Sequence, residues 1–251
     1  MRNLTDKVFL ICGAAGGIGA DVSRRLLEEG ARVAIADIDK DGANALAAQY
    51  DEQQAYAVWY DQGDEQSIHT LLDKTIEHFG QLDGLLANAA NMKVLLEDGD
   101  LLSNSVAVWE QTLQVNVTGL ASLFRAAIPH LFERGGVLLA TSSDAASVGE
   151  PTRVAYAASK AATNAICRHV ANRWGNEGIR CNVISPGLIM TEQLEAHLAP
   201  TMTEKMLART PSTRHGRGED IASAAAFLFS DDAQWINGQV WHVNGGVTQT
   251  N

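Results

Sequence analysis

Short apolar segments alternate with amphipathic segments along nearly the whole chain. The apolar segments predict strands at 8–12, 32–36, 55–60, 82–87, 137–141, 179–184 and 239–243. The amphipathic segments predict helices at 20–29, 40–49, 65–79, 106–132, 155–174 and 220–229. Alternation of this kind is typical of a mostly parallel sheet with helices on both faces. We therefore expect an α/β protein, with a doubly wound (Rossmann) parallel sheet of about seven strands, and a single domain over residues 1–251.

One long segment interrupts the alternation. Residues 188–216 lie between the sixth and seventh predicted strands and carry leucine and methionine at spacings of one to four residues. An ordinary pair of amphipathic helices explains this pattern at least as well as a substrate-binding lid. The lid interpretation rests on the fact that long excursions in compact domains are often functional.

Composition and charge exclude several classes of function. The chain has 251 residues, of which 46% are hydrophobic and 20% charged, as in an ordinary globular protein. Its net charge of −11 disfavours binding to nucleic acid or to an anionic membrane surface. No apolar run approaches the roughly 20 residues that span a bilayer, and the N-terminal run is too short for a signal peptide.

The reactive residue types narrow the choice further. Cys12, Cys167 and Cys181 are odd in number and widely spaced, which indicates reduced thiols in a cytoplasmic protein. The 7 histidines show neither metal-ligand spacing nor a neighbouring carboxylate cluster, so we expect no metal site. Ser142 and Ser143 do not lie in a GxSxG elbow, which disfavours a hydrolase triad.

The first predicted strand leads into a glycine-rich turn that opens a helix. Gly13, Gly17 and Gly19 let the backbone approach a pyrophosphate, and the helix N-terminus offers free N–H groups to the anion. A tight strand-to-helix turn would need the same glycines, but the position in the first βα unit favours dinucleotide binding.

Asp37 ends the second predicted strand, 18 residues after Gly19. A carboxylate at this position accepts hydrogen bonds from the adenosine ribose and repels a 2′-phosphate, which favours NAD over NADP. The alternative is a surface aspartate that caps the next helix.

Tyr156 and Lys160 are four residues apart in a predicted helix and therefore share one face. A free phenol has a pKa of about 10 and is a poor base at neutral pH. A neighbouring ammonium lowers that pKa, so the pair could transfer a proton, although the spacing alone occurs by chance in many helices.

Taken together, the motifs resemble the short-chain dehydrogenase/reductase family over nearly the whole chain. The matching motifs occur in the family's order: Gly13-x-x-x-Gly17-x-Gly19, Asp61, Asn88-Ala89-Ala90, Asn116, Ser143, Tyr156-x-x-x-Lys160, Pro186-Gly187 with Thr191, and the closing segment 237–246. Five positions depart from the family's pattern, and none of them is a reacting group: Cys12, Gln62, Gly63, Ala90 and Gly218.

The resemblance implies a set of site residues. The implied catalytic residues are Asn116, Ser143, Tyr156 and Lys160. The implied cofactor-binding residues are Gly13, Gly17, Ile18, Gly19, Asp37, Asp61, Asn88, Ala89, Tyr156, Lys160, Pro186, Gly187, Ile189 and Thr191. Tyr156 would carry the proton of the substrate hydroxyl, and Lys160 would lower its pKa and hold the nicotinamide ribose. Ser143 would hydrogen-bond the substrate oxygen, and Asn116, in a kinked helix, would hold a water that links Lys160 to solvent.

The substrate pocket is expected between segments 91–98, 144–153 and 187–212. The side chains expected to line it are Met92, Val94, Ser143, Val148, Leu188, Met190, Leu194 and Met206. These segments hold few fixed charges apart from Lys93 and Arg153. This favours a neutral, moderately hydrophobic alcohol or ketone that is cyclic, aryl-substituted or steroid-like.

The expected function is therefore that of an NAD-dependent short-chain alcohol dehydrogenase or ketoreductase acting on a small molecule. The alternatives are a reductase of 3-oxoacyl thioesters or other carbonyls and, less favoured, a non-catalytic dinucleotide-binding protein. In the family, helices equivalent to 106–132 and 155–174 pair across a dimer and the last strand completes a tetramer, so a homotetramer is expected.

Overall fold

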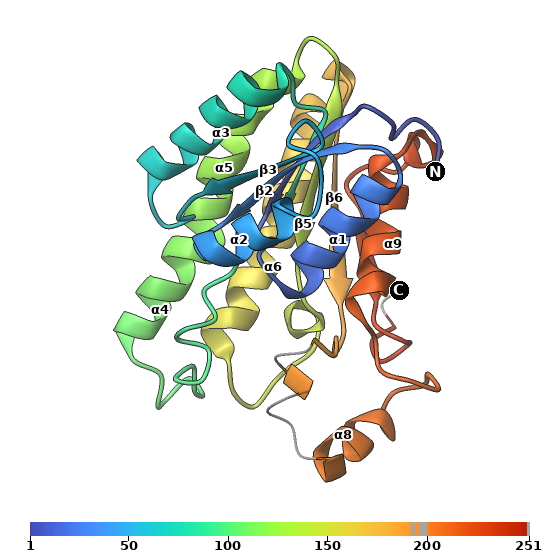
Figure 1. Cartoon of the computed structure of the whole chain (residues 1–251). Coiled ribbons are helices and arrows are strands. Elements are labelled where there is room, and N and C mark those ends of the chain that lie inside the picture. The colour runs from blue at the N-terminus through green and yellow to red at the C-terminus, as the bar shows by residue number, and fades with distance from the viewer. Residues whose placement is uncertain (192–193, 196–199, 250–251) are drawn as a thin grey trace.

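Seven strands form one parallel sheet in the order β3-β2-β1-β4-β5-β6-β7 (Figure 1). The computed structural model describes residues 1–191, 194–195 and 200–249. The strands are β1 (Val8–Cys12), β2 (Arg32–Asp37), β3 (Ala55–Trp59), β4 (Gly84–Ala87), β5 (Gly136–Thr141), β6 (Ile179–Pro186) and β7 (Val240–Val243). The order of the strands reverses between β1 and β4, which is where ligands bind in open sheets of this kind. The predicted doubly wound fold is confirmed.

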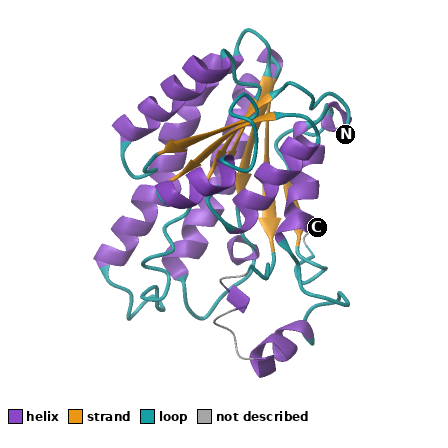
Figure 2. Cartoon of the chain, in the orientation of Figure 1, coloured by secondary structure: helices purple, strands orange, loops and turns teal. Residues whose placement is uncertain are grey.

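Helices cover both faces of the sheet (Figure 2). The α-helices are α1 (Gly17–Glu28), α2 (Lys40–Ala47), α3 (Glu65–Phe79), α4 (Val106–Leu113), α5 (Leu120–Ala127), α6 (Val154–Trp174), α8 (Pro200–Leu207) and α9 (Gly218–Phe229). A π-helical turn spans Gln114–Gly119, and short 3₁₀ turns span Ile128–Leu131, Asp144–Ala146, Gly175–Glu177 and Asp231–Ala233. None of the helices in the described part of the chain is long and apolar enough to cross a membrane.

The strands read as continuous apolar runs because both faces of the sheet are buried. In β1, Val8, Leu10 and Cys12 pack in one core cluster with residues of α3, α5 and α6. Phe9 and Ile11 point the other way and pack in a second cluster with residues of α1, α2 and α9. All five residues of β1 are buried, so the strand cannot alternate between apolar and polar positions.

The predicted helix at 106–132 is not one regular helix. The π-helical turn separates α4 from α5, and a 3₁₀ turn follows α5. The turn packs closely on the segment after β3: a Cβ on Gly119 would lie 2.2 Å from the Gln62 carbonyl oxygen. The side-chain amide of Gln62 also donates to the Val115 carbonyl at 2.9 Å. The kink expected around Asn116 is thus present, as a π-helical turn.

The excursion at 188–216 begins and ends at one point. Ile189 forms a parallel bridge with Gly216, and the Met190 amide donates to the Gly216 carbonyl at 2.8 Å. Helix α8 lies within the excursion, beyond the sheet edge (Figure 1). Residues 192–193 and 196–199 of the predicted lid lie outside the described residues.

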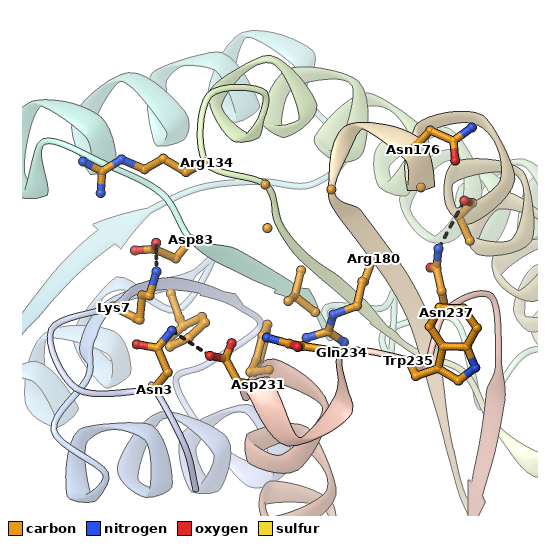
Figure 3. A pocket seen from close by; sticks show the side chains of 18 of the residues that line it. Asn3, Lys7, Asp83, Arg134, Asn176, Arg180, Asp231, Gln234, Trp235 and Asn237 are labelled. Carbon is orange, nitrogen blue, oxygen red and sulfur yellow. Dashed lines mark hydrogen bonds and ion pairs between the residues drawn. The ribbon is translucent and has the colours of Figure 1, made fainter.

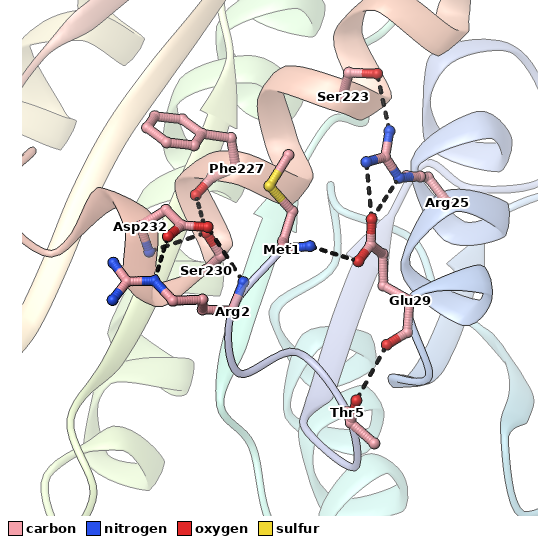
Figure 4. A network of polar contacts seen from close by, with 9 residues as sticks. All are labelled: Met1, Arg2, Thr5, Arg25, Glu29, Ser223, Phe227, Ser230 and Asp232. Atoms are coloured by element: carbon pink, nitrogen blue, oxygen red, sulfur yellow. Dashed lines mark hydrogen bonds and ion pairs between the residues drawn. The ribbon is translucent and has the colours of Figure 1, made fainter.

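Ion pairs hold the N-terminal segment at the C-terminal ends of α1 and α9 (Figure 4). The Met1 ammonium and Arg25 both pair with Glu29, and together they lower the pKa of that carboxyl group. Arg2 pairs with Asp232, in the 3₁₀ turn after α9. Because α1 starts at the carboxyl end of β1, this network lies at the opposite edge of the sheet from the glycine-rich turn.

Candidate active site

The glycine-rich turn and the segment after β4 are in direct contact at the point where the strand order reverses. Gly13 has φ +78°, and a Cβ there would lie 2.7 Å from the Ala89 nitrogen. A Cβ on Gly19 would lie 2.0 Å from the Gly13 carbonyl oxygen. The Asn88 side-chain amide donates to that same carbonyl at 2.9 Å, which ties the end of β4 to the turn. Only glycine fits at these two positions of the turn.

The N-terminus of α1 fits the phosphate end of a dinucleotide. Gly16 is its N-cap residue, no side chain caps it, and its first turn carries no acidic residue. The first N–H groups of a helix need a partner, and the helix dipole favours an anion there. Because Gly13 and Gly19 have no Cβ atom, the backbone of the turn can come close to that anion.

Asp37 lies against the glycine-rich turn and does not cap α2. Its carboxylate accepts hydrogen bonds from the Ala15 and Asp39 amides, each at 2.9 Å. The N-cap of α2 is instead Asp39, which accepts from the Gly42 amide at 3.1 Å. The capping alternative for Asp37 is therefore wrong.

The remaining cofactor candidates follow the carboxyl ends of β3 and β6. Asp61 lies just after β3, and its carboxylate accepts from the Gly63 amide at 2.8 Å. Pro186 ends β6, and Gly187 and Ile189 follow it. Thr191 reaches the glycine-rich turn: its Cγ2 would lie 3.3 Å from a Cβ on Gly17. Ile18 is partly buried against the core cluster beneath α1.

The four catalytic candidates come from three elements. Tyr156 and Lys160 lie in the first two turns of α6, Ser143 follows β5, and Asn116 lies in the π-helical turn. The Lys160 ammonium lies 5.6 Å from the centroid of the Tyr156 ring and donates to the Thr141 carbonyl at 2.7 Å. The structure thus brings Ser143, Tyr156 and Lys160 together.

Burial governs the titration of the pair. It raises the pKa of the Tyr156 phenol, an effect opposed by a hydrogen bond with Ser143 and by the charge of Arg153. It also lowers the pKa of the Lys160 ammonium from 10.5 to about 8. The net shift of the Tyr156 pKa is therefore upward, the reverse of the lowering expected from Lys160, because desolvation of the phenolate is the larger effect.

Asn116 supports the site through its side-chain amide. Its Oδ1 accepts from the Asn91 amide at 2.8 Å, and its Nδ2 donates to the Ser159 hydroxyl at 3.0 Å. Ser159 in turn donates to the Tyr156 carbonyl at 2.7 Å. Asn116 is 3% exposed and joins the segment after β4 to α6. The water that it is expected to hold stays a prediction.

The predicted pocket residues lie on loops that follow β4, β5 and β6. Met92 and Val148 are exposed, whereas Val94 is buried. Leu188, Met190, Leu194 and Met206 are partly exposed and belong to the excursion after β6. All these loops leave the carboxyl edge of the sheet, on the same side as Tyr156.

A cavity of about 780 Å³ lies at the edge of the sheet opposite to these loops (Figure 3). Lys7 and Asp83, which precede β1 and β4, line it together with Arg180 near the start of β6. Because none of the predicted site residues lines this cavity, we do not assign the reaction to it. Among the residues that the structure describes, no group of three or more His, Cys, Asp or Glu side chains could hold a metal ion.

Sequence reasoning missed two buried polar residues of the site. Gln62, noted only as a departure from the family pattern, is 4% exposed and joins the π-helical turn to the segment after β4. Asp98 is also 4% exposed and bonds to the first turn of α6. No local pattern marks either residue, because their partners lie far away in the sequence.

Comparisons with known proteins agree with this geometry. Residues 13–248 match the family model described as enoyl-(acyl carrier protein) reductase. A probable short-chain type dehydrogenase/reductase of Bradyrhizobium diazoefficiens is 38% identical over 98% of this chain and 89% of its own. The cis-4-hydroxycyclohexanecarboxylate dehydrogenase of Sinomonas cyclohexanicum is 36% identical over 97% of both chains.

A solved structure extends the likeness to three dimensions. It is that of a 7α-hydroxysteroid dehydrogenase complexed with NADH and 7-oxo glycochenodeoxycholic acid, with a TM-score of 0.91 and 34% identity over 100% of this chain and 99% of its own. The motifs, the topology and these relatives lead to one assignment: the chain belongs to the short-chain dehydrogenase/reductase family of oxidoreductases.

Proposed function

We propose that this protein interconverts a secondary alcohol and a ketone with NAD as the hydride carrier. One observation supports this proposal above all: Ser143, Tyr156 and Lys160 meet at the carboxyl edge of the sheet, the edge that also carries a glycine-rich turn that fits a dinucleotide. When bound, the nicotinamide supplies the acceptor or donor of the hydride.

The protein's own residues would position the substrate oxygen and move its proton. The Ser143 hydroxyl would hydrogen-bond the oxygen on which charge develops. Tyr156 would take the hydroxyl proton during oxidation and return it to the carbonyl oxygen during reduction. Because burial raises the pKa of Tyr156, the phenol carries its proton at neutral pH, which suits the reductive direction. Lys160 lies close enough to favour the phenolate when it forms.

The preference for NAD follows from Asp37. Its carboxylate lies at the glycine-rich turn and is held by the Ala15 and Asp39 amides. A 2′-phosphate placed there would be repelled by the Asp37 carboxylate. Both oxygens of this carboxylate accept hydrogen bonds, so the side chain is held in place. Asp61, Asn88, Gly187 and Thr191 would complete the cofactor site.

The substrate would be a neutral, moderately hydrophobic, cyclic alcohol or ketone. Two relatives support the cyclic class, since one is a dehydrogenase of a hydroxycyclohexanecarboxylate and one is a hydroxysteroid dehydrogenase. Arg153, the cation closest in sequence to Tyr156, pairs with Glu150, which leaves less net charge to attract a substrate anion. Residues 188–216 would act as the lid over this pocket.

A substrate panel tests the proposal. Cyclic, aryl and steroid alcohols and ketones are assayed in both directions with NAD(H) and NADP(H), beside 3-oxoacyl thioesters and charged hydroxy acids. Turnover of neutral cyclic substrates with NAD(H) is the expected result. Exclusive turnover of a thioester with NADPH would instead establish the alternative reductase. Cofactor binding without turnover of any substrate would establish the non-catalytic alternative.

We further propose assembly as a homotetramer through the helices of segment 106–132 (α4 and α5), α6 and β7. Light scattering at micromolar concentration checks this expectation, and a monomer would contradict it.

A further inference from the structure

The catalytic helix α6 begins without a cap of its own. Arg153 occupies its N-cap position with φ 65° and ψ 38°, and its side chain makes no capping hydrogen bond. The first N–H groups of any helix lack partners within the helix, and a side chain at the N-cap normally accepts from the second or third of them. In α6 these are the amides of Ala155 and Tyr156.

Asp98 supplies the missing acceptors from more than fifty residues away. Its Oδ2 accepts from the Tyr156 amide at 2.7 Å, and its Oδ1 accepts from the Ala155 amide at 3.1 Å. Its backbone carbonyl accepts from the Arg153 amide at 2.9 Å. The side chain thus takes the two bonds that an N-cap side chain would take, and the carboxylate charge is favourable at a helix N-terminus.

The loop that carries Asp98 holds it in place. The Asn104 side-chain amide donates to Oδ1 at 2.6 Å. The next residues form a tight turn, in which Asp100 accepts from the Ser103 amide at 2.9 Å. A Cβ on Gly99 would lie 2.5 Å from the Ser103 hydroxyl oxygen, so the turn closes directly beside Asp98. Asp98 itself is 4% exposed.

We propose that Asp98 is a positioning residue for the Tyr156 phenol. This inference rests on the proposed function, in which Tyr156 carries the proton. The carboxylate bonds the backbone N–H of Tyr156 itself, so it fixes the point from which the phenol side chain extends. Asp98 belongs to the segment 91–98 that is expected to bound the substrate pocket, so it also fixes that wall relative to Tyr156.

The contribution of Asp98 is geometric. The Asp98 carboxylate bonds backbone amides of α6, whereas the charged groups near the Tyr156 phenol include Arg153, Glu150 and Lys160. Loss of the Asp98 charge should therefore lower kcat without moving the pH at which the phenol titrates. A displacement of about 1 Å at a reacting group can cost up to about a hundredfold in rate.

Asp98→Asn tests this role, with Asp83→Asn as the matched control. Asp83 is 6% exposed and also bonds a backbone amide, that of Val8 at 2.8 Å, but it lies at the opposite edge of the sheet (Figure 3). For D98N we expect kcat to fall between about tenfold and a hundredfold, with the NAD Kd and the pH profile unchanged. For D83N we expect a comparable loss of Tm and an unchanged kcat.

Amide hydrogen exchange gives a readout that does not depend on turnover. Amides in an uncapped first turn exchange fast, so protection of Ala155 and Tyr156 in the wild-type protein, and its loss in D98N alone, is the expected result. If no substrate in the panel is turned over, the proposed function fails while the exchange data still test the anchoring. If D98N does not fold, Asp98→Glu retains the carboxylate and should show a partly reduced kcat.

Three results would overturn the inference. The first is fast exchange of the two amides in the wild-type protein. The second is a D98N variant that loses Tm as D83N does but keeps its kcat. The third is a stable D98E variant with wild-type kcat and no protection of the two amides. That result would show that turnover does not depend on the hydrogen bonds to the Ala155 and Tyr156 amides.

Discussion

Lys160 should make the protein more stable as the pH rises through the alkaline range. Burial lowers its pKa from 10.5 to about 8, so the unfolded chain binds its proton more tightly than the folded chain does. The free energy of unfolding rises with pH wherever the unfolded state binds more protons, which for Lys160 is the window between about 8 and 10.5. The whole difference amounts to about 3 kcal/mol, since one pKa unit corresponds to about 1.4 kcal/mol.

Lys160→Met isolates this contribution. Methionine fills a similar volume and has no titrating group, so the lost hydrogen bond to the Thr141 carbonyl shifts the stability of the variant by a constant. Groups whose pKa burial raises, such as Tyr60 and Cys12, titrate in both proteins and cancel in the difference. Between pH 7 and pH 10 the wild-type protein should gain about 2.5 kcal/mol relative to the variant.

Urea unfolding of both ligand-free proteins at half-unit pH steps measures this gain. A difference that stays flat across the window, or that falls with pH, would refute the argument that burial disfavours the Lys160 ammonium. The result also bears on function, because an ammonium with a pKa near 8 can release its proton under mild conditions. The wild-type protein should oxidise alcohols faster as the pH rises. The raised pKa of Tyr156 keeps the phenol protonated at neutral pH, and oxidation needs the phenolate as the base.

Three further substitutions test the remaining parts of the site. Tyr156→Phe should lower kcat by at least about a hundredfold and leave the NAD Kd within a few-fold, and near-normal turnover would reject the assignment of the acid–base residue. Asp37→Asn should raise the ratio of NADP to NAD kcat/KM by about tenfold, since it removes the charge opposed to the 2′-phosphate; an unchanged ratio would remove Asp37 from cofactor selection. Gly19→Ala should abolish NAD binding in calorimetry because its Cβ would lie 2.0 Å from the Gly13 carbonyl oxygen, and normal NAD binding by the folded variant would contradict the need for glycine at this position.

The sequence predicted the sheet well because the pattern that forms it is local. Strands buried on both faces are short apolar runs, and each lies between helices whose own periodicity is distinct. All seven predicted strands are present, and the errors lie at the ends. The strand predicted from Leu82, for example, begins at Gly84, because Asp83 turns its carboxylate onto the Val8 amide and Lys7.

The sequence could not predict contacts made across long separations. The spacing of Tyr156 and Lys160 indicated a shared helix face, but the depth of burial that sets both pKa values depends on packing with β5 and the segment after it. The predicted direction of the Tyr156 pKa shift was therefore wrong, since burial raises this pKa instead of lowering it. Asp98 presents the same difficulty, because an aspartate in a loop gives no sign that its partners lie on α6.

Gln62 departs from the family pattern, yet its hydrogen bonds join the segments that surround the site. Its Nε2 donates to the Val115 and Ala89 carbonyls, at 2.9 and 3.3 Å, and its Oε1 accepts from the Tyr60 hydroxyl at 3.2 Å. An amide is the one side chain of this shape that offers two donors and an acceptor, so neither a valine nor a glutamate could replace these bonds. The π-helical turn that carries Asn116 lies directly over this residue, since a Cβ on Gly119 would lie 2.2 Å from the Gln62 carbonyl oxygen. Every polar group of the Gln62 side chain thus has a hydrogen-bond partner. Through this one buried side chain, the end of β3, the segment after β4 and the π-helical turn are joined.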